Sequence, residues 1–176
     1  MIRSVEWAKQ HVRTVLEENL AERLEAGRAL WADGLRIAVP RPGLRPDGDY
    51  YQHLVDPETV SQFPACCVYV RESRSQPGVT SSTIHQAHLV TVRFLDTVSG
   101  AYDVGSVEAL VRRLERYEAA VKDLFVWRKT RLQTLDVPAG IAAGVTWLAS
   151  RFPNEPGGVR TAEVDFSVRV HENQGS

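Results

Sequence analysis

The segment from Thr161 to His171 alternates apolar and polar residues almost without error, and this pattern restricts the fold more than any other feature of the chain. Successive side chains of a β-strand point to opposite faces, so such a strand turns one face to a core and the other to water or a partner. The residues expected to face inward are Ala162, Val164, Phe166, Val168 and Val170, and those expected outward are Thr161, Glu163, Asp165, Ser167, Arg169 and His171.

Four further runs predict strands that would complete a sheet. Ala65 to Arg71 and Ala87 to Asp96 are rich in Val, Tyr, Phe and Thr. Residues 141–152 form an apolar run before the turn that leads into the alternating strand. A short strand is also expected from Leu35 to Val39.

Two segments have helical spacing instead. Ser4 is a suitable N-cap for a first helix that ends near Leu30, and Ser106 is a suitable N-cap for a second helix that ends near Lys129. Both segments carry apolar residues at intervals of three and four, which predicts one packed face on each helix.

The second helix also carries a group of arginines. Arg112, Arg113 and Arg116 are expected on its exposed face, interleaved with Glu115 and Glu118. Because acids and bases alternate there, the pattern indicates a salt-bridged surface rather than a nucleic-acid patch.

Prolines and glycines concentrate between residues 40 and 62, and residues 72–86 are polar and contain a Pro-Gly pair. Both stretches are therefore predicted to be long extended loops. The expected order in a single domain, residues 1–176 with the N-terminal helix at 1–31, is helix, short strand, loop, two strands, helix, two strands. This order predicts an α+β fold, a mostly antiparallel β-sheet with both helices packed on one face.

Composition limits the class of function. The 21 basic and 22 acidic residues give a net charge of −1, so bulk attraction to nucleic acid or anionic lipid is not expected. No stretch approaches about 18 uncharged apolar residues, and the first residues lack a signal-peptide pattern. Adjacent Cys66 and Cys67 would point to opposite faces of a strand, which disfavours a disulfide between them. These features predict a soluble cytoplasmic protein with reduced thiols.

Few residues suggest chemistry. His85 and His88 would point to opposite faces of a strand and would converge poorly on a metal. Glu163 and Asp165 share a face, but no third ligand or partner can be placed beside them, so a solvated or channel-lining face is the alternative. The glycines match no phosphate-binding or dinucleotide-binding motif. We therefore expect no enzyme, and assign no catalytic residue, metal ligand or cofactor.

The four tryptophans, Trp7, Trp31, Trp127 and Trp147, lie at or near the ends of the predicted elements. Core packing is the default for each of them, and an anchor at a protein interface is the alternative. The sequence leaves this choice open.

Several short patterns follow one another between residues 50 and 171. Val55-Asp56-Pro57 comes before a strand entry at Phe63-Pro64-Ala65, and His88 to Phe94 reads H-x-V-x-V-x-F. A helix with Leu114, Tyr117 and Ala120 follows, and the alternating strand comes last. In this order the chain resembles the tail terminator and tail-completion proteins of long-tailed bacteriophages.

The resemblance implies a virion protein of the tail or neck that is assembled in the host cytoplasm. Its copies would form a hexameric ring that caps the tail tube protein and joins it to head-neck or connector proteins. DNA would pass through the lumen without specific binding, and neither a membrane nor a cofactor would be involved. The implied lumen-facing residues are Glu163 and Asp165. The implied contacts with tube or neck lie in the two long loops, at Arg41, Arg45, Asp47, Tyr50, Arg74, Ser75, Gln76 and Pro77.

Other functions remain open on the sequence. The longer arm at residues 40–62 departs from the family pattern and allows a head-to-tail connector or completion role. A small metal-dependent enzyme on an α+β sheet would be monomeric and would depend on Glu163, Asp165 or His88. A toxin-like or regulatory module would bind a different protein and would form no ring.

Overall fold

The computed structural model describes residues 5–77, 83–98, 106–127, 142–155 and 158–173. Within these residues, two α-helices and five strands follow one another, with two short helical segments between them. In order, they are α1 (Val5–Trp31), β1 (Tyr50–Tyr51), the 3-10 turn η1 (Pro57–Thr59), β2 (Ala65–Pro77), β3 (Thr83–Thr97), α2 (Val107–Lys122), the π-helical η2 (Asp123–Trp127), β4 (Ala142–Arg151) and β5 (Val159–Asn173).

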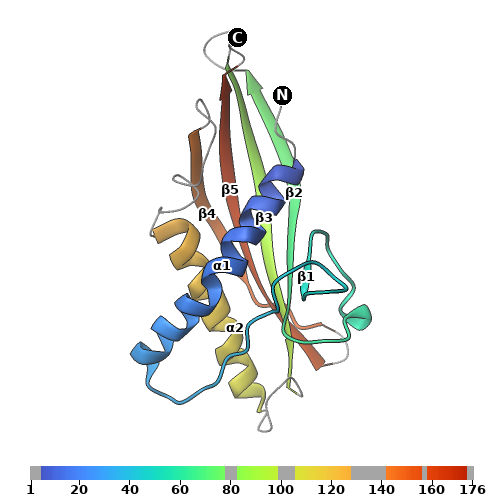
Figure 1. The fold of residues 1–176 in the computed structure, drawn as a ribbon, viewed down its shortest axis with the longest axis vertical. Coiled ribbons are helices and arrows are strands. Elements are labelled where there is room, and N and C mark those ends of the chain that lie inside the picture. The colour runs from blue at the N-terminus through green and yellow to red at the C-terminus, as the bar shows by residue number, and fades with distance from the viewer. Residues whose placement is uncertain (1–4, 78–82, 99–105, 128–141, 156–157, 174–176) are drawn as a thin grey trace.

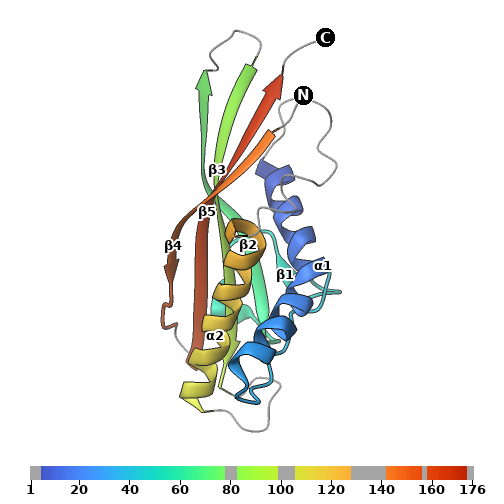
Figure 2. The ribbon, with the colours of Figure 1, turned by 90° about the vertical axis from the view of Figure 1, so that its left-hand side faces the viewer.

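The strands form one sheet in the order β1-β2-β3-β5-β4. β1 runs parallel to β2, and the other three pairings are antiparallel. Both helices lie on the same face of this sheet, which Figure 2 shows from the side. The predicted α+β class, with a mostly antiparallel sheet and helices on one face, is confirmed.

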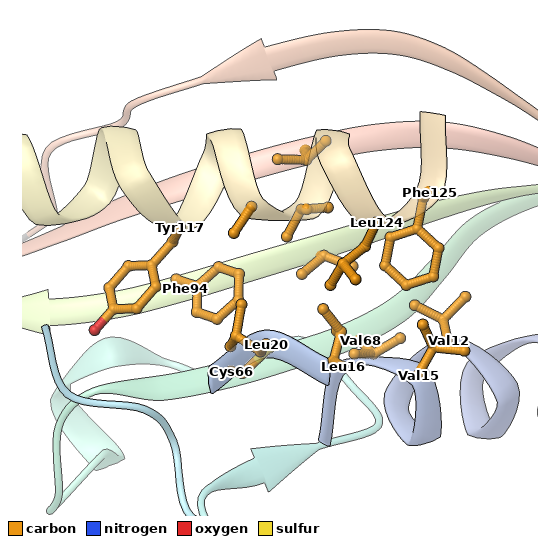
Figure 3. Packing of buried hydrophobic residues seen from close by; sticks show 14 of the residues in the cluster. Val12, Val15, Leu16, Leu20, Cys66, Val68, Phe94, Tyr117, Leu124 and Phe125 are labelled. Carbon is orange, nitrogen blue, oxygen red and sulfur yellow. The ribbon is translucent and has the colours of Figure 1, made fainter. Parts of the chain in front are cut away.

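The core lies between the helices and the inward residues of the three long strands. Phe94 of β3 stacks on Tyr117 of α2 with ring centroids 4.6 Å apart (Figure 3), and Phe125 stacks on Phe166 of β5 at 5.1 Å. Burial of one such side chain contributes about 1.5–3 kcal/mol. The predicted inward residues of β5 are all buried in this core, namely Ala162, Val164, Phe166, Val168 and Val170.

The helices begin where the sequence predicts. α1 ends at Trp31, next to the predicted end at Leu30, whereas α2 ends at Lys122, before the predicted end near Lys129. Ser106 caps α2, and its hydroxyl accepts a hydrogen bond from the Ala109 N–H at 3.0 Å. After Lys122 the helix widens into η2, which places Leu124 and Phe125 in the core. No helix in the described ranges is long and apolar enough to cross a lipid bilayer.

The predicted loop at residues 72–86 is wrong over its described part. β2 continues to Pro77 and β3 begins at Thr83, and the two strands pair as far as Pro77 and Ile84. The polar side chains did not end the strands because the ladder joins backbone groups, which every residue except proline carries in full. The β2–β3 hairpin and β5 therefore run past the N-terminal end of α1 (Figure 1).

The predicted strand from Leu35 to Val39 is also wrong, because this stretch joins no sheet. The place beside β2 is taken instead by Tyr50 and Tyr51, which pair with Cys66 and Cys67. The rest of the 40–62 arm then crosses to the other face of the sheet, where Val55 and Val60 form a second, smaller core with residues of β2, β3 and β5.

Candidate functional site

Glu163 and Asp165 lie on the sheet face opposite the helices, since the residue between them, Val164, belongs to the core. This face was predicted to meet water or a partner. Both side chains are nevertheless buried, because the residues are only 7% and 5% exposed. Their neighbours on the adjoining strands cover them.

The antiparallel register brings two arginines beside these carboxylates. Arg93 of β3 and Arg151 of β4 stand directly opposite Glu163. Arg151 Nη2 lies 3.0 Å from Glu163 Oε2 and 2.6 Å from Asp165 Oδ2. Arg93 Nε lies 3.3 Å from Glu163 Oε1.

A third arginine arrives through a bulge in β2. The register shift between Val70 and Glu72 leaves Arg71 without a partner in the ladder. Its Nη2 donates to Glu163 Oε2 at 3.0 Å, and its Nε lies 4.0 Å from Asp165 Oδ1. The Thr91 hydroxyl donates to the same Asp165 oxygen at 2.6 Å.

We call Arg71, Arg93, Arg151, Glu163 and Asp165 the ionic cluster. Its three cations face two carboxylates, and Glu155, which pairs with Arg93, supplies the third negative charge. Burial lowers the pKa of Arg151, but its hydrogen bonds with Asp165 and Glu163 outweigh this effect, so its pKa is raised. Solvent meets the half-exposed Arg71 and Arg151 side chains rather than the carboxylates. The arrangement suits a cross-strand brace better than proton transfer, because each carboxylate is held by two or more partners.

The exposed arginine face predicted for α2 is wrong for two of its members. Arg113 is 1% exposed, and its Nε lies 2.7 Å from Asp96 Oδ2. Its Nη2 also donates to the Thr97 carbonyl at 2.9 Å. Burial raises the pKa of Asp96, although the hydrogen bond from Arg113 acts in the opposite direction.

Arg116 is likewise buried, at 5% exposed. It pairs with Asp33 just after α1 and lies over the Trp31 ring, with 4.5 Å between the guanidinium carbon and the ring centroid. Arg112 is exposed and pairs with Glu108 one turn earlier, as predicted for a surface salt bridge. The buried arginines fasten α2 to β3 and to the end of α1.

Of the candidate residues in the 40–62 arm, Arg41, Arg45 and Asp47 are at least partly exposed, whereas Tyr50 is buried. Arg41 forms a two-pronged ion pair with Asp49, and the Arg45 Nε donates to the Tyr51 hydroxyl at 3.0 Å. Asp47 is exposed. Tyr50 is fully buried in β1, so its side chain is part of the core and offers no surface to a partner.

The remaining candidates lie along β2 in the projecting hairpin. Arg74 and Ser75 are exposed there, and Arg74 pairs with Glu72. Gln76 and Pro77 lie in β2, and the tip at 78–82 lies outside the described residues. These predicted contact residues therefore lie on a strand that pairs with β3, and not in a loop.

The histidine and cysteine predictions can be checked in part. His88 is 2% exposed, and its Nδ1 lies 2.8 Å from the Ser73 hydroxyl, which agrees with the predicted hydrogen-bonded imidazole. Cys66 and Cys67 lie in a strand, β2, as predicted, where both thiols are free and buried, and burial raises the pKa of the Cys67 thiol to about 12. The described side chains include no group of three His, Cys, Asp or Glu residues placed to hold a metal ion.

One surface was missed by the sequence analysis. The edge strand β4 and its end expose three large apolar side chains, Trp147 at 43%, Leu148 at 51% and Phe152 at 47%. A bulge between Trp147 and Ala149 leaves Leu148 out of the ladder, which turns it away from the regular alternation. The only sequence signal was the position of Trp147 among the candidate interface anchors.

No protein-family model matches the chain, and a search of curated proteins gives no match. Among solved structures, the chain is similar to a chain of a structure described as "Virion of native gene transfer agent (GTA) particle". The two are 17% identical with a TM-score of 0.45, over 91% of this chain and 97% of that chain. A similarity at this level says nothing by itself about activity or partners.

Proposed function

We propose that this chain is a non-enzymatic virion assembly protein, a tail terminator whose copies close into a hexameric ring. The ring caps the tail tube and joins it to the head-neck proteins. The resemblance of residues 50–171 to tail terminator and completion proteins supports this role. The pairing of every charged group in the ionic cluster supports a surface function over proton-transfer catalysis.

The observation that carries the proposal is a sheet that is open at both edges within the described residues. β4 forms one edge, and β2 beyond Cys67 forms the other, because β1 covers only two residues of β2. A closed ring needs such heterologous contacts, in which one surface of a subunit binds a different surface of the next. The exposed apolar side chains on β4 favour its burial in a contact of this kind.

The strand directions fit head-to-tail pairing. Since β2, β3, β5 and β4 alternate in direction, β4 runs opposite to β2. Rotation about an axis parallel to the strands keeps their directions, so β4 of one copy would meet β2 of the next in antiparallel fashion. Each added copy would then continue the alternation around the ring.

In this ring the face with the ionic cluster lines the channel. Glu163, Asp165 and Glu155 balance the three arginines, so the charges within the ionic cluster cancel, while the exposed Arg169 of β5 also lies on this face. DNA adsorbs where unpaired cations replace its counterions, and a face whose clustered arginines are paired therefore binds it weakly. Arg41, Asp47, Arg74 and Ser75 are the proposed contacts with tube or neck.

The ring is tested by light scattering and negative-stain imaging of the purified protein. We expect closed rings for the natural chain, and loss of rings in the variant Trp147→Asp/Leu148→Asp. Gln10→Asp, at an exposed position of α1, is the matched control and should keep the ring. Open filaments, or rings that survive the double substitution, would contradict head-to-tail closure through β4.

The tail role is tested separately. Arg74→Ala/Ser75→Ala should weaken binding to tail tubes while leaving the thermal unfolding midpoint within about 2 °C of the parent. The gene for this chain should also lie beside the tail tube and tape-measure genes. A neighbourhood without virion genes would count against the proposal.

A further inference from the structure

The stretch from Leu35 to Val39 has the sequence of a strand and no strand partner. It runs without turn or bend between Gly34 and Pro40, beside the C-terminal half of α1 (Figure 1). In the described structure its backbone makes two hydrogen bonds, from the Leu35 N–H to Asp33 Oδ1 at 3.1 Å and from the Tyr117 hydroxyl to the Ala38 carbonyl at 2.6 Å. Among the described residues, none accepts a hydrogen bond from the amides of residues 36–39.

The stretch forms one wall of a groove of about 670 Å³. Ala21 and Leu24 of α1 form the facing wall, and Leu35, Ile37 and Val39 supply the apolar side chains of the near wall. Ile37 and Val39 also pack against the main core, and the Tyr117 bond fixes the backbone between them. The groove is therefore built on an anchored chain, which lowers the entropy cost of binding.

The charge at the groove is positive. Glu25 and Arg28 line it and pair with each other at 3.4 Å, so their charges cancel. Arg36 lines it as well, is exposed, and makes no ion pair or hydrogen bond in the described structure. One unbalanced cation thus lies beside an apolar groove with a free strand edge.

We infer that this groove binds an extended segment of another protein, which adds as a strand to residues 35–39. The free amides select an extended backbone, and the apolar walls select apolar side chains at alternate positions. Arg36 selects an acidic residue on the flank of that segment. Among the described strands with a free edge, β4 carries apolar residues without an acid, and the apolar residues of β2 beyond Cys67, Val68 to Val70, already pack in or against the cores of the chain itself. We therefore take the partner to be a different protein.

This inference does not rest on the proposed function, because the groove uses neither edge of the sheet. In a ring it would be a site for a tube or neck protein, and in any other setting it would be a peptide-binding site. Failure of ring formation leaves it standing, and its failure leaves the ring standing.

The probe is a library of random 12-residue peptides displayed for selection on the full-length chain. We expect the selected peptides to alternate apolar residues and to carry a flanking Asp or Glu. The best peptide is then synthesised in two forms, each N-methylated at alternate residues. One form should lose about tenfold or more in affinity and the other should keep it, because only one edge of an added strand faces the groove. Equal affinities for both forms would overturn strand addition.

Protein variants identify the groove as the site. Ala21→Phe fills it from the helix and should abolish binding, with unchanged circular dichroism and unchanged mass in solution. Arg36→Glu should weaken the acidic peptide about fivefold to tenfold, and Arg169→Glu, an exposed arginine of β5, should not. Hydrogen exchange at residues 36–39 should slow when the natural chain is saturated with peptide. Three results would each overturn the inference: binding that survives Ala21→Phe, a library that enriches no alternating sequence, or a fall in mass on substitution. A fall in mass would assign the groove to a second copy.

Discussion

Removal of Arg113 should make the stability of this protein depend steeply on pH. In the variant Arg113→Met the helix keeps a side chain of similar length, but Asp96 loses the guanidinium that lies 2.7 Å from its Oδ2. Asp96 itself is 1% exposed, so water does not replace the lost partner. Loss of one member of a buried ion pair costs about 3–5 kcal/mol.

The buried carboxylate has one way to reduce that cost, which is to take up a proton. Protonation at pH 7 of a carboxyl with a reference pKa of 3.8 costs about 1.4 kcal/mol per pH unit, or about 4 kcal/mol in total. The destabilisation at pH 7 should therefore be about 4 kcal/mol, and at pH 5 it should fall to about 1–2 kcal/mol. The sign follows from linkage. The folded-state pKa of Asp96 is raised above its unfolded value, so the folded state binds the proton more tightly and gains stability as pH falls.

Urea unfolding of both proteins at pH 7 and pH 5, with linear extrapolation, measures these differences. The double variant Arg113→Met/Asp96→Leu is the control, since it removes both charges and should cost less than the single variant and show no such pH dependence. A loss below about 1 kcal/mol for Arg113→Met, or a loss equal at both pH values, would show that this ion pair is not desolvated as the structure indicates.

Three further outcomes follow from the same structure. Glu163→Gln should lower the free energy of unfolding by about 2–3 kcal/mol in urea titrations, because three arginines lose a shared anion. The control Glu58→Gln, at an exposed site, should change it by less than about 0.5 kcal/mol. Gly48→Ala should cost about 2 kcal/mol in the same assay, since its Cβ would lie 2.0 Å from the Gly43 carbonyl oxygen, and a neutral result would mean that the arm relaxes freely. Burial raises the pKa of Cys67 to about 12 and that of Cys66 well above its usual value. A thiol reagent at pH 8 should therefore modify the two cysteines only as fast as the protein unfolds. Rapid labelling under native conditions would contradict their burial.

The sequence by itself determined which side chains enter the main core. The period of two in β5 and the helical spacing in α1 and α2 are local properties, because the backbone geometry of one element fixes which residues share a face. The inward residues of β5 and the fold class could therefore be predicted without knowing what they contact. The pairing of Glu108 with Arg112 and of Glu118 with Lys122 is local in the same way.

Only the tertiary structure decided which polar residues are buried and what they meet. Arg113 lies three residues after Leu110 and four before Tyr117, on the buried side of α2, but only the structure shows that the end of β3 brings Asp96 beside it. Glu163 and Asp165 share a face by local geometry, but the three arginines reach them through strand register and a bulge, which depend on pairing between distant segments. Leu35 to Val39 shows the same limit, since its residues favour a strand but the stretch joins no sheet, and β1 pairs with β2 instead. Strand propensity is set within a few residues, whereas the partner of a strand is set by the whole chain.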